Sequence, residues 1–208
     1  MLVYKLFYGK DAAWVGEVKH SWQQVDDHYV AETSIEAVGL AALFYGKSLV
    51  QRSEGRLVAE GLRPVLYSQR ESGKREERVD FDWAQGNAYL SRGSKAAQAV
   101  SQGTQDVVSL LHQFYFMQPL QENNIIYVAT PRRVDMHIVQ VLGKEDLDLP
   151  IGTVRSLHLK RVEPDGTQIE MWVDQDRSLL PVRIYTLSRK GAILDYQLQS
   201  MEAITGKD

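Results

Sequence analysis

Apolar and polar residues alternate with a period of two along most of this chain, which is the pattern of strands that bury one face of a sheet. Residues 104–117 depart from that alternation, because four apolar side chains recur there at helical spacing: Val107, Leu110, Leu111 and Phe114. Thr104 is suited to cap this helix, Asp106 is expected in its first turn, and Pro119 follows its end. The sequence therefore predicts one amphipathic helix in a chain made otherwise of strands.

The alternating segments predict about eleven strands joined by tight turns, among them a hairpin of residues 153–162 and 168–173. Consecutive hairpins produce an antiparallel sheet, and a sheet with this many strands curls. We expect a mainly β fold, in which a large, curved, half-barrel-like antiparallel sheet carries the helix buried on its concave side. Three stretches break the alternation and are expected as a short helix or apolar loop (36–47), a flexible loop (92–103) and an acidic loop (144–150).

The length of 208 residues permits one large β domain, and we expect residues 1–208 to form a single domain. The net charge is −3 with acids and bases mixed along the chain, so there is no basic stripe and we expect no nucleic-acid partner. Cysteine is absent, which excludes disulfides, thiolate metal sites and cysteine nucleophiles. No apolar run approaches the ~20 residues of a transmembrane helix, and no signal peptide is visible before the first expected strand.

Six short motifs follow one another along the chain: Ser53-Glu54-Gly55, Gly61-Leu62-Arg63-Pro64-Val65-Leu66-Tyr67, Val79-Asp80-Phe81-Asp82, Gln105-Asp106-Val107-Val108-Ser109, Trp172-Val173-Asp174 and Leu180-Pro181-Val182-Arg183-Ile184. Their order and spacing resemble the bacterial family of unknown function DUF3108 over most of the chain. The resemblance implies an exported, envelope-associated, periplasmic protein; a cytoplasmic location is the alternative, because no targeting segment is visible. It implies no activity and no catalytic residue. In architecture alone, a curled sheet with helices on its concave side is similar to the lipoprotein carriers of the periplasm.

Five histidines invite a metal or acid–base interpretation: His20, His28, His112, His137 and His158. No two of them stand at helical i, i+4 spacing or in an H-E-x-x-H setting, so we expect no metal site. His20 is expected as a core histidine bonded to backbone, and His112 on the polar side of the helix. The glycines are dispersed, without a phosphate-binding loop or a dinucleotide fingerprint, and we expect no cofactor.

Asp80 and Asp82 share a strand face, so their carboxylates could act as the acid and base of a glycoside hydrolase. The same alternation beside Arg78 is also typical of a solvated strand face. Three serines are possible nucleophiles, but none lies in a G-x-S-x-G elbow: Ser53, Ser109 and Ser156. We therefore assign no catalytic residue and expect a protein that is not an enzyme.

Our leading hypothesis is a non-enzymatic envelope protein that holds a hydrophobic or amphipathic, lipid-like ligand between the sheet and the helix. The glycine-flanked apolar stretch Val38–Tyr45 is a candidate lid. The residues expected to contact the ligand are Leu40, Leu43, Phe44, Leu111, Phe114 and Tyr115. The second hypothesis is a structural or interaction module of the envelope with a filled core, which would bind an envelope protein. The third is the glycan hydrolase that uses Asp80 and Asp82.

Overall fold

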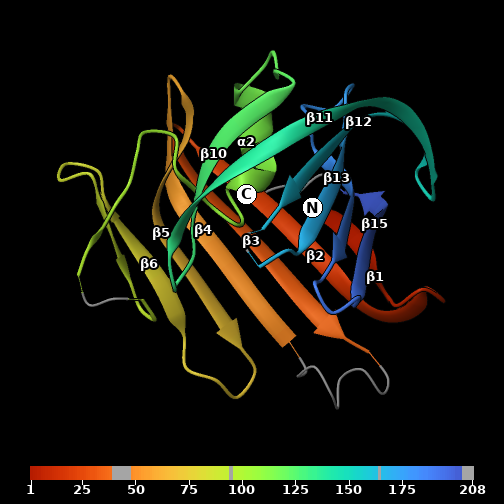
Figure 1. Cartoon of the computed structure of the whole chain (residues 1–208), viewed down its shortest axis with the longest axis horizontal. Coiled ribbons are helices and arrows are strands. Elements are labelled where there is room, and N and C mark those ends of the chain that lie inside the picture. Colours follow the sequence, from red (N-terminus) through yellow and green to blue (C-terminus); the bar gives the residue numbers. More distant parts are fainter. Residues whose placement is uncertain (39–47, 94–95, 164, 203–208) are drawn as a thin grey trace.

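The computed structural model describes residues 1–38, 48–93, 96–163 and 165–202, and within these ranges it forms one continuous sheet of fifteen strands with a single short helix on its concave side (Figure 1). The prediction of a mainly β fold with a large curved sheet and one helix is confirmed. The strand count is larger than expected, because short strands occupy both ends of the sheet.

The strands are β1 (Leu2–Tyr8), β2 (Ala13–Val25), β3 (His28–Ala37), β4 (Ser48–Val58), β5 (Gly61–Glu71), β6 (Glu77–Asp82), β7 (Asn87–Leu90), β8 (Gln98–Ala99), β9 (Gln105–Asp106), β10 (Asn123–Ala129), β11 (Val134–Leu149), β12 (Gly152–Val162), β13 (Gln168–Asp174), β14 (Pro181–Leu187) and β15 (Ile193–Met201). The helix is α2 (Leu110–Phe116). Strands follow one another through hairpins, so neighbours pair antiparallel, and only the two-residue β9 runs parallel to its neighbour β10.

The first and last strands pair with each other, which joins the two halves of the chain in the middle of the sheet. Leu2 lies opposite Met201, and the strand order runs from β8 through β1 and β15 to β9. The two halves then curve toward each other, so that β10 and β11 pass over β3–β5 in Figure 1. The ends of the sheet meet through two hydrogen bonds, from the Arg92 N–H to the Pro131 carbonyl and from the Val134 N–H to the side chain of Gln98. The sheet thereby surrounds an interior space.

Three apolar clusters fill parts of that interior. One lies among β3, β5, β6 and β7, a second packs α2 against β10–β13, and a third joins β1 and β2 to β13–β15. Alternating strand residues supply most of each cluster, but on β13 Met171 and Val173 join the second cluster while Trp172, on the opposite face of the strand, joins the third. Leu110 and Phe114 carry the apolar side of α2 into the second cluster.

A buried polar seam holds α2 to β4. The Asp106 carboxylate accepts hydrogen bonds from the N–H groups of Val108 and Ser109, at 2.8 and 2.9 Å, and from the Ser53 hydroxyl at 2.6 Å. Burial raises the pKa of Asp106 to about 6, and these donors act in the opposite direction. The Ser53 hydroxyl also lies 3.1 Å from the hydroxyl of Tyr29. The seam fixes the turn from which the helix starts.

A second contact joins the helix to the turn between β4 and β5. The Gln113 side chain accepts the Leu62 N–H at 2.8 Å and donates to the Glu60 carbonyl at 3.1 Å. Gly61 has φ +113°, and a Cβ at this position would lie 2.6 Å from Gln113 Oε1. Only glycine permits both this backbone conformation and the close approach of the helix.

The helix is shorter than the sequence predicts, because Gln105 and Asp106 pair with β10 as a strand. Thr104 is therefore not the cap, and its hydroxyl donates to the Ser101 carbonyl. Asp106 precedes the first turn of α2 rather than lying in it, and its side chain binds the N–H groups of the turn that leads into the helix.

The acidic loop predicted over 144–150 is also wrong, because β11 continues as a strand to Leu149. Asp146 lies opposite Arg155, and Asp148 opposite Thr153, whose hydroxyl donates a hydrogen bond to the Asp148 carboxylate. Leu147 and Leu149 alternate with them and pack on the third cluster. Part of the predicted 92–103 loop forms β8. The 36–47 stretch begins within β3, and its remainder, including all of the candidate lid except Val38, lies outside the described residues.

Candidate functional site

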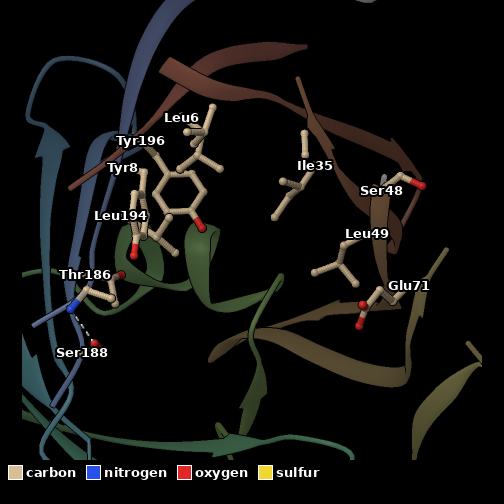
Figure 2. A pocket seen from close by; sticks show the side chains of 13 residues that line it. Leu6, Tyr8, Ile35, Ser48, Leu49, Glu71, Thr186, Ser188, Leu194 and Tyr196 are labelled. Atoms are coloured by element: carbon tan, nitrogen blue, oxygen red, sulfur yellow. Dashed lines mark hydrogen bonds between the residues drawn. The ribbon is translucent and has the colours of Figure 1, made fainter. Parts of the chain in front are cut away.

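An apolar cavity of about 380 Å³ opens between the two halves of the sheet. Figure 2 shows Leu6, Tyr8, Leu194 and Tyr196 on one side of the opening and Ile35 and Leu49 on the other. Its remaining described lining residues come from these strands, from β2, β5 and β14, and from the ends of strands: Val15, Ala37, Ser48, Glu71, Thr186, Ser188 and Ala192. We call this space the outer apolar cavity.

A second cavity of about 220 Å³ lies between the start of α2 and the sheet. The helix side supplies four apolar residues: Val107, Val108, Leu110 and Leu111. Strand residues facing them include Val18 of β2, Met171 of β13 and Ile184 of β14. The hollow between helix and sheet is therefore only partly filled, and we call it the inner cavity.

A third cavity of about 500 Å³ separates β4–β6 from β10–β12 and is polar. Arginines and acids line it: Arg132, Arg133, Arg161, Glu77, Asp135, Glu163 and Asp165. Most of the acids are paired with arginines at 2.9 Å or less, Glu77 with Arg92, Glu163 with Arg161 and Asp135 with Arg133. We call this space the polar cavity.

The three cavities form a chain through the interior, because neighbouring cavities share lining residues. Ile35, Thr186 and Tyr196 line both the outer apolar and the inner cavity. Gln51, Val107 and Arg161 line both the inner and the polar cavity. The three cavities thus lie in a row, with the apolar cavity at one end, the inner cavity beside the helix, and the polar cavity at the other end. The outer apolar and polar cavities fall within the range of pockets that hold small organic ligands, about 300–1,000 Å³, and the inner cavity is smaller.

Two histidines meet beside the inner cavity. His20 Nε2 lies 2.7 Å from His112 Nε2, and His20 Nδ1 lies 2.8 Å from the hydroxyl of Thr33. Burial lowers the pKa of His20 to about 4 and that of His112 to about 3, and each neutral ring can donate one bond and accept another. The expected core position of His20 is confirmed, although its ring bonds to side chains rather than backbone. The expectation for His112 is wrong, because its ring is turned into the sheet.

Arg161 and His137 bring buried polar atoms to the polar cavity. Arg161 Nη2 lies 2.9 Å from Glu163 Oε1, while its Nη1 has no hydrogen-bond partner in the described part of the chain. His137 Nδ1 lies 3.6 Å from Glu163 Oε2, too far for a hydrogen bond, and it too lacks a partner among the described residues. Buried polar atoms without partners are uncommon in folded proteins. These two therefore require an explanation.

The residues that were predicted to contact the ligand do not all lie at the same place in the structure. Leu111 lines the inner cavity. Phe114 is buried against a narrow void of about 20 Å³ beside β11–β13. Tyr115 is 48% exposed, outside the lining of the cavities above, because it stands on the solvent side of the helix. Leu40, Leu43 and Phe44 lie outside the described residues.

The catalytic alternatives gain no site. Asp80 pairs with Arg78 at 2.9 Å and Asp82 accepts the Gln85 N–H, and neither aspartate lines any of the three cavities described above. Ser53 and Ser109 are bonded to Asp106, and the Ser156 hydroxyl donates to the Glu145 carbonyl. Within the described ranges, no three histidine or acidic side chains come together to hold a metal ion. In that same part of the chain, no helix reaches the length and apolarity needed to cross a bilayer.

Sequence reasoning missed Arg161 and His137, although the sequence carries a signal for both. Arg161 has the same strand parity as the buried Leu159, and His137 has the same parity as the buried Val139. A charged or polar residue in phase with buried positions of a strand is directed into the interior. Arg161 and His137 are therefore two polar exceptions among the inward-facing apolar residues of their strands, and both line the polar cavity.

Comparisons with known proteins support the fold without adding an activity. The family described as "Protein of unknown function (DUF3108)" matches residues 3–195. A beta-barrel-like protein of the domain of unknown function DUF1849 from Brucella abortus matches 95% of this chain and 94% of its own, with a TM-score of 0.60 and 11% identity. A Bacteroides fragilis protein with a YmcC-like fold covers 97% of this chain and 94% of its own, at 8% identity and a TM-score of 0.37. A search of curated proteins finds no match.

Proposed function

Since the chain belongs to the DUF3108 family, whose description assigns no function, we propose from its geometry that it is a non-enzymatic protein that binds a hydrophobic or amphipathic, lipid-like ligand inside the curved sheet. The observation that carries the proposal is the pair of adjacent hollows, the outer apolar and inner cavities, which share the lining residues Ile35, Thr186 and Tyr196. Apolar side chains dominate both linings, and such a site favours an alkyl chain.

The energetics favour a chain-shaped ligand over a compact polar one. Each buried methylene contributes about 0.8 kcal/mol, which corresponds to about a fourfold gain in affinity. A preformed hollow also reduces the cost of ordering the protein when the ligand binds. We therefore expect the affinity for straight-chain alcohols to rise about fourfold per added methylene until the two apolar cavities are filled.

Titration with the uncharged fluorescent probe N-phenyl-1-naphthylamine tests the proposal. We expect saturable binding to the wild-type chain and at least tenfold weaker binding to Thr186→Trp, whose indole would block the junction of the two cavities. Val65→Trp is the matched control, because Val65 lies on β5 and is exposed at the sheet surface. Equal binding to all three proteins, or no saturable binding to the wild type, would contradict the proposal.

A periplasmic location remains part of this proposal, supported by the family resemblance described above. Fractionation of cells that express the full-length gene product should place the protein with periplasmic or envelope markers. Recovery with cytosolic markers would leave the cavity intact but would contradict the assignment to the envelope.

A second candidate function, an interaction module of the envelope, is favoured by an apolar stripe on the outer face of β10 and β11. Ile125 lies opposite Ile138 and Tyr127 opposite Met136, and three of these four side chains are largely exposed. Exposed apolar patches of this kind occur at protein–protein interfaces. If the stripe binds an envelope protein, Ile138→Lys should abolish co-purification of that protein while leaving probe binding unchanged.

A further inference from the structure

The head-group chemistry of the ligand can be inferred from Arg161, which stands where the inner cavity meets the polar cavity. Its side chain is only 14% exposed, although it carries a permanent charge. The residue belongs to β12 and shares inward parity with Leu159 of the second apolar cluster. A cation is thus built into the wall at the boundary between the apolar and the charged space.

The guanidinium of Arg161 is incompletely satisfied by the protein. Glu163 accepts a bond from Nη2, whereas Nη1 is buried and has no partner among the described residues. Burial lowers the pKa of Arg161, and the charge of Glu163 acts in the opposite direction without cancelling the shift. A guanidinium offers five N–H donors in a planar fork, and a second anion would satisfy the unused side of that fork.

His137 provides a second, independent group on the neighbouring strand β11. Its ring is buried and lines the same polar cavity, and its Nδ1 is likewise without a partner in the described chain. The desolvated ring lies close enough to Arg161 for that charge to lower the pKa of His137 further. Neutral histidine can donate a hydrogen bond from one ring nitrogen. Two buried polar groups on adjacent strands, each with an unused hydrogen-bonding atom in the described chain, therefore line one space.

The other charged groups of the polar cavity favour an anion over a cation. Glu77 and Asp135 are paired with Arg92 and Arg133, and Glu163 with Arg161. Asp165 is at the exposed rim and accepts the Thr167 N–H. The Arg132 guanidinium, by contrast, forms no ion pair with any residue in the described ranges. The unused hydrogen-bonding capacity of this space thus belongs mainly to arginine.

We propose that the ligand is a single-chain amphiphile with an anionic head group of the carboxylate type, whose alkyl chain occupies the inner and outer apolar cavities and whose head group binds Arg161 and His137 in the polar cavity. This inference rests on the function proposed above and adds the ligand's charge and orientation to it. One chain is preferred over two, because the inner cavity under the helix has a volume of about 220 Å³.

Displacement of N-phenyl-1-naphthylamine by three ligands of equal chain length tests the head group. The ligands are dodecanoate, dodecan-1-ol and dodecyltrimethylammonium, each below its micelle concentration. We expect the wild type to bind dodecanoate at least tenfold more tightly than dodecan-1-ol, because a hydrogen bond to a charged group is worth about 1.5–3 kcal/mol. Dodecyltrimethylammonium should bind most weakly.

Arg161→Met removes the charge and keeps the length of the side chain, so it should remove the preference for dodecanoate without weakening the binding of dodecan-1-ol. Arg155→Met is the matched control, because Arg155 lies on the same strand and pairs with Asp176 at the surface. Arg161→Lys, which retains a charge, should keep part of the preference. If Arg161→Met fails to fold, the order of the three ligands on the wild-type chain decides the question.

The outcomes separate the two proposals. Failure of all three ligands to displace the probe would contradict ligand binding itself. Equal affinity for dodecanoate and dodecan-1-ol, or a preference for dodecyltrimethylammonium, would overturn the anionic head group and leave the apolar site standing. A preference for dodecanoate that survives Arg161→Met would show that the head group binds elsewhere.

Discussion

The two sides of α2 differ in how they meet the sheet. Toward β4 and β5 the helix is fixed by buried hydrogen bonds that the side chains of Asp106 and Gln113 accept. Toward β13–β15 it faces the inner cavity, where apolar side chains line unfilled space. The directional hydrogen bonds toward β4 and β5 are enough to set the position of the helix. Contacts with β13–β15 are therefore not required to hold it. The space on that side is available for a ligand.

The difference also separates two kinds of buried polar group. In the seam, the Asp106 carboxylate accepts three hydrogen bonds. Beside the polar cavity, Arg161 and His137 each retain an atom without a partner in the described chain. Satisfied groups add to the stability of the fold, whereas unsatisfied ones lower it unless a ligand completes them. Experiments that treat the two regions separately test this contrast.

The largest effect is expected when the seam is broken by Asp106→Ala. The substitution leaves the N–H groups of Val108 and Ser109 buried without the carboxylate that accepts their hydrogen bonds, at about 1–3 kcal/mol each, and it removes the bond between Ser53 and Asp106. We expect the free energy of unfolding at pH 7.5, measured with urea, to fall by about 3–5 kcal/mol. Asp165→Ala, which removes an exposed aspartate bonded to one N–H, is the control. A loss below about 1 kcal/mol for Asp106→Ala would show that the seam does not fix the helix.

A matched pair of valines compares the filled and hollow regions directly. Val79 is fully buried in the first apolar cluster, whereas Val15 lines the outer apolar cavity. We expect Val79→Ala to lower the free energy of unfolding by about 2–3 kcal/mol and Val15→Ala by less than about 1 kcal/mol, since only the first creates a new void in a packed region. Equal losses in urea denaturation would mean that the two regions are packed alike.

A smaller effect is expected from the histidine pair, as a change in pH dependence. The folded pKa values of His20 and His112, about 4 and about 3, lie below the unfolded value near 6.5, so the unfolded chain binds more protons in between. Stability from this pair is therefore present above pH 6.5 and is lost as the pH falls toward 4. Between pH 6.5 and 4.5 the unfolded chain binds one proton at His20 and one at His112 that the folded chain does not bind. His112→Gln removes the second of these protons. The slope of the unfolding free energy against pH in this range should therefore decrease by about 1.4 kcal/mol per pH unit. An unchanged slope would show that His112 is protonated alike in both states.

The alternation of residues was sufficient to predict the curved sheet, because inward parity and tight turns largely determine an antiparallel arrangement. The alternation was insufficient where one sequence pattern is compatible with two kinds of local structure. Residues 146–149 alternate charged and apolar side chains after the charged Lys144-Glu145, and their cross-strand partners on β12, rather than their composition, make this stretch a strand. Residues 104–106 fit a helical period, but pairing with β10 competes with the helix and prevails.

The candidate site was predictable in part. Leu111 lines the inner cavity as the helical pattern indicated, whereas Tyr115 is exposed, because the shorter helix turns it toward solvent. The role of Arg161 could have been inferred from its parity with Leu159. The cavities themselves could not, because their volumes depend on how far the two halves of the sheet curve toward each other, and no local pattern encodes that distance.

A crystal structure of the wild-type chain with 12-bromododecanoic acid, recorded at the bromine absorption edge, tests the account most directly. We expect an anomalous peak in the inner or outer apolar cavity, within the space bounded by Leu111, Ile35 and Tyr196, with the carboxylate at Arg161. A bromine peak confined to the outer surface, with the inner cavity empty or filled by collapsed side chains, would contradict ligand binding inside the sheet.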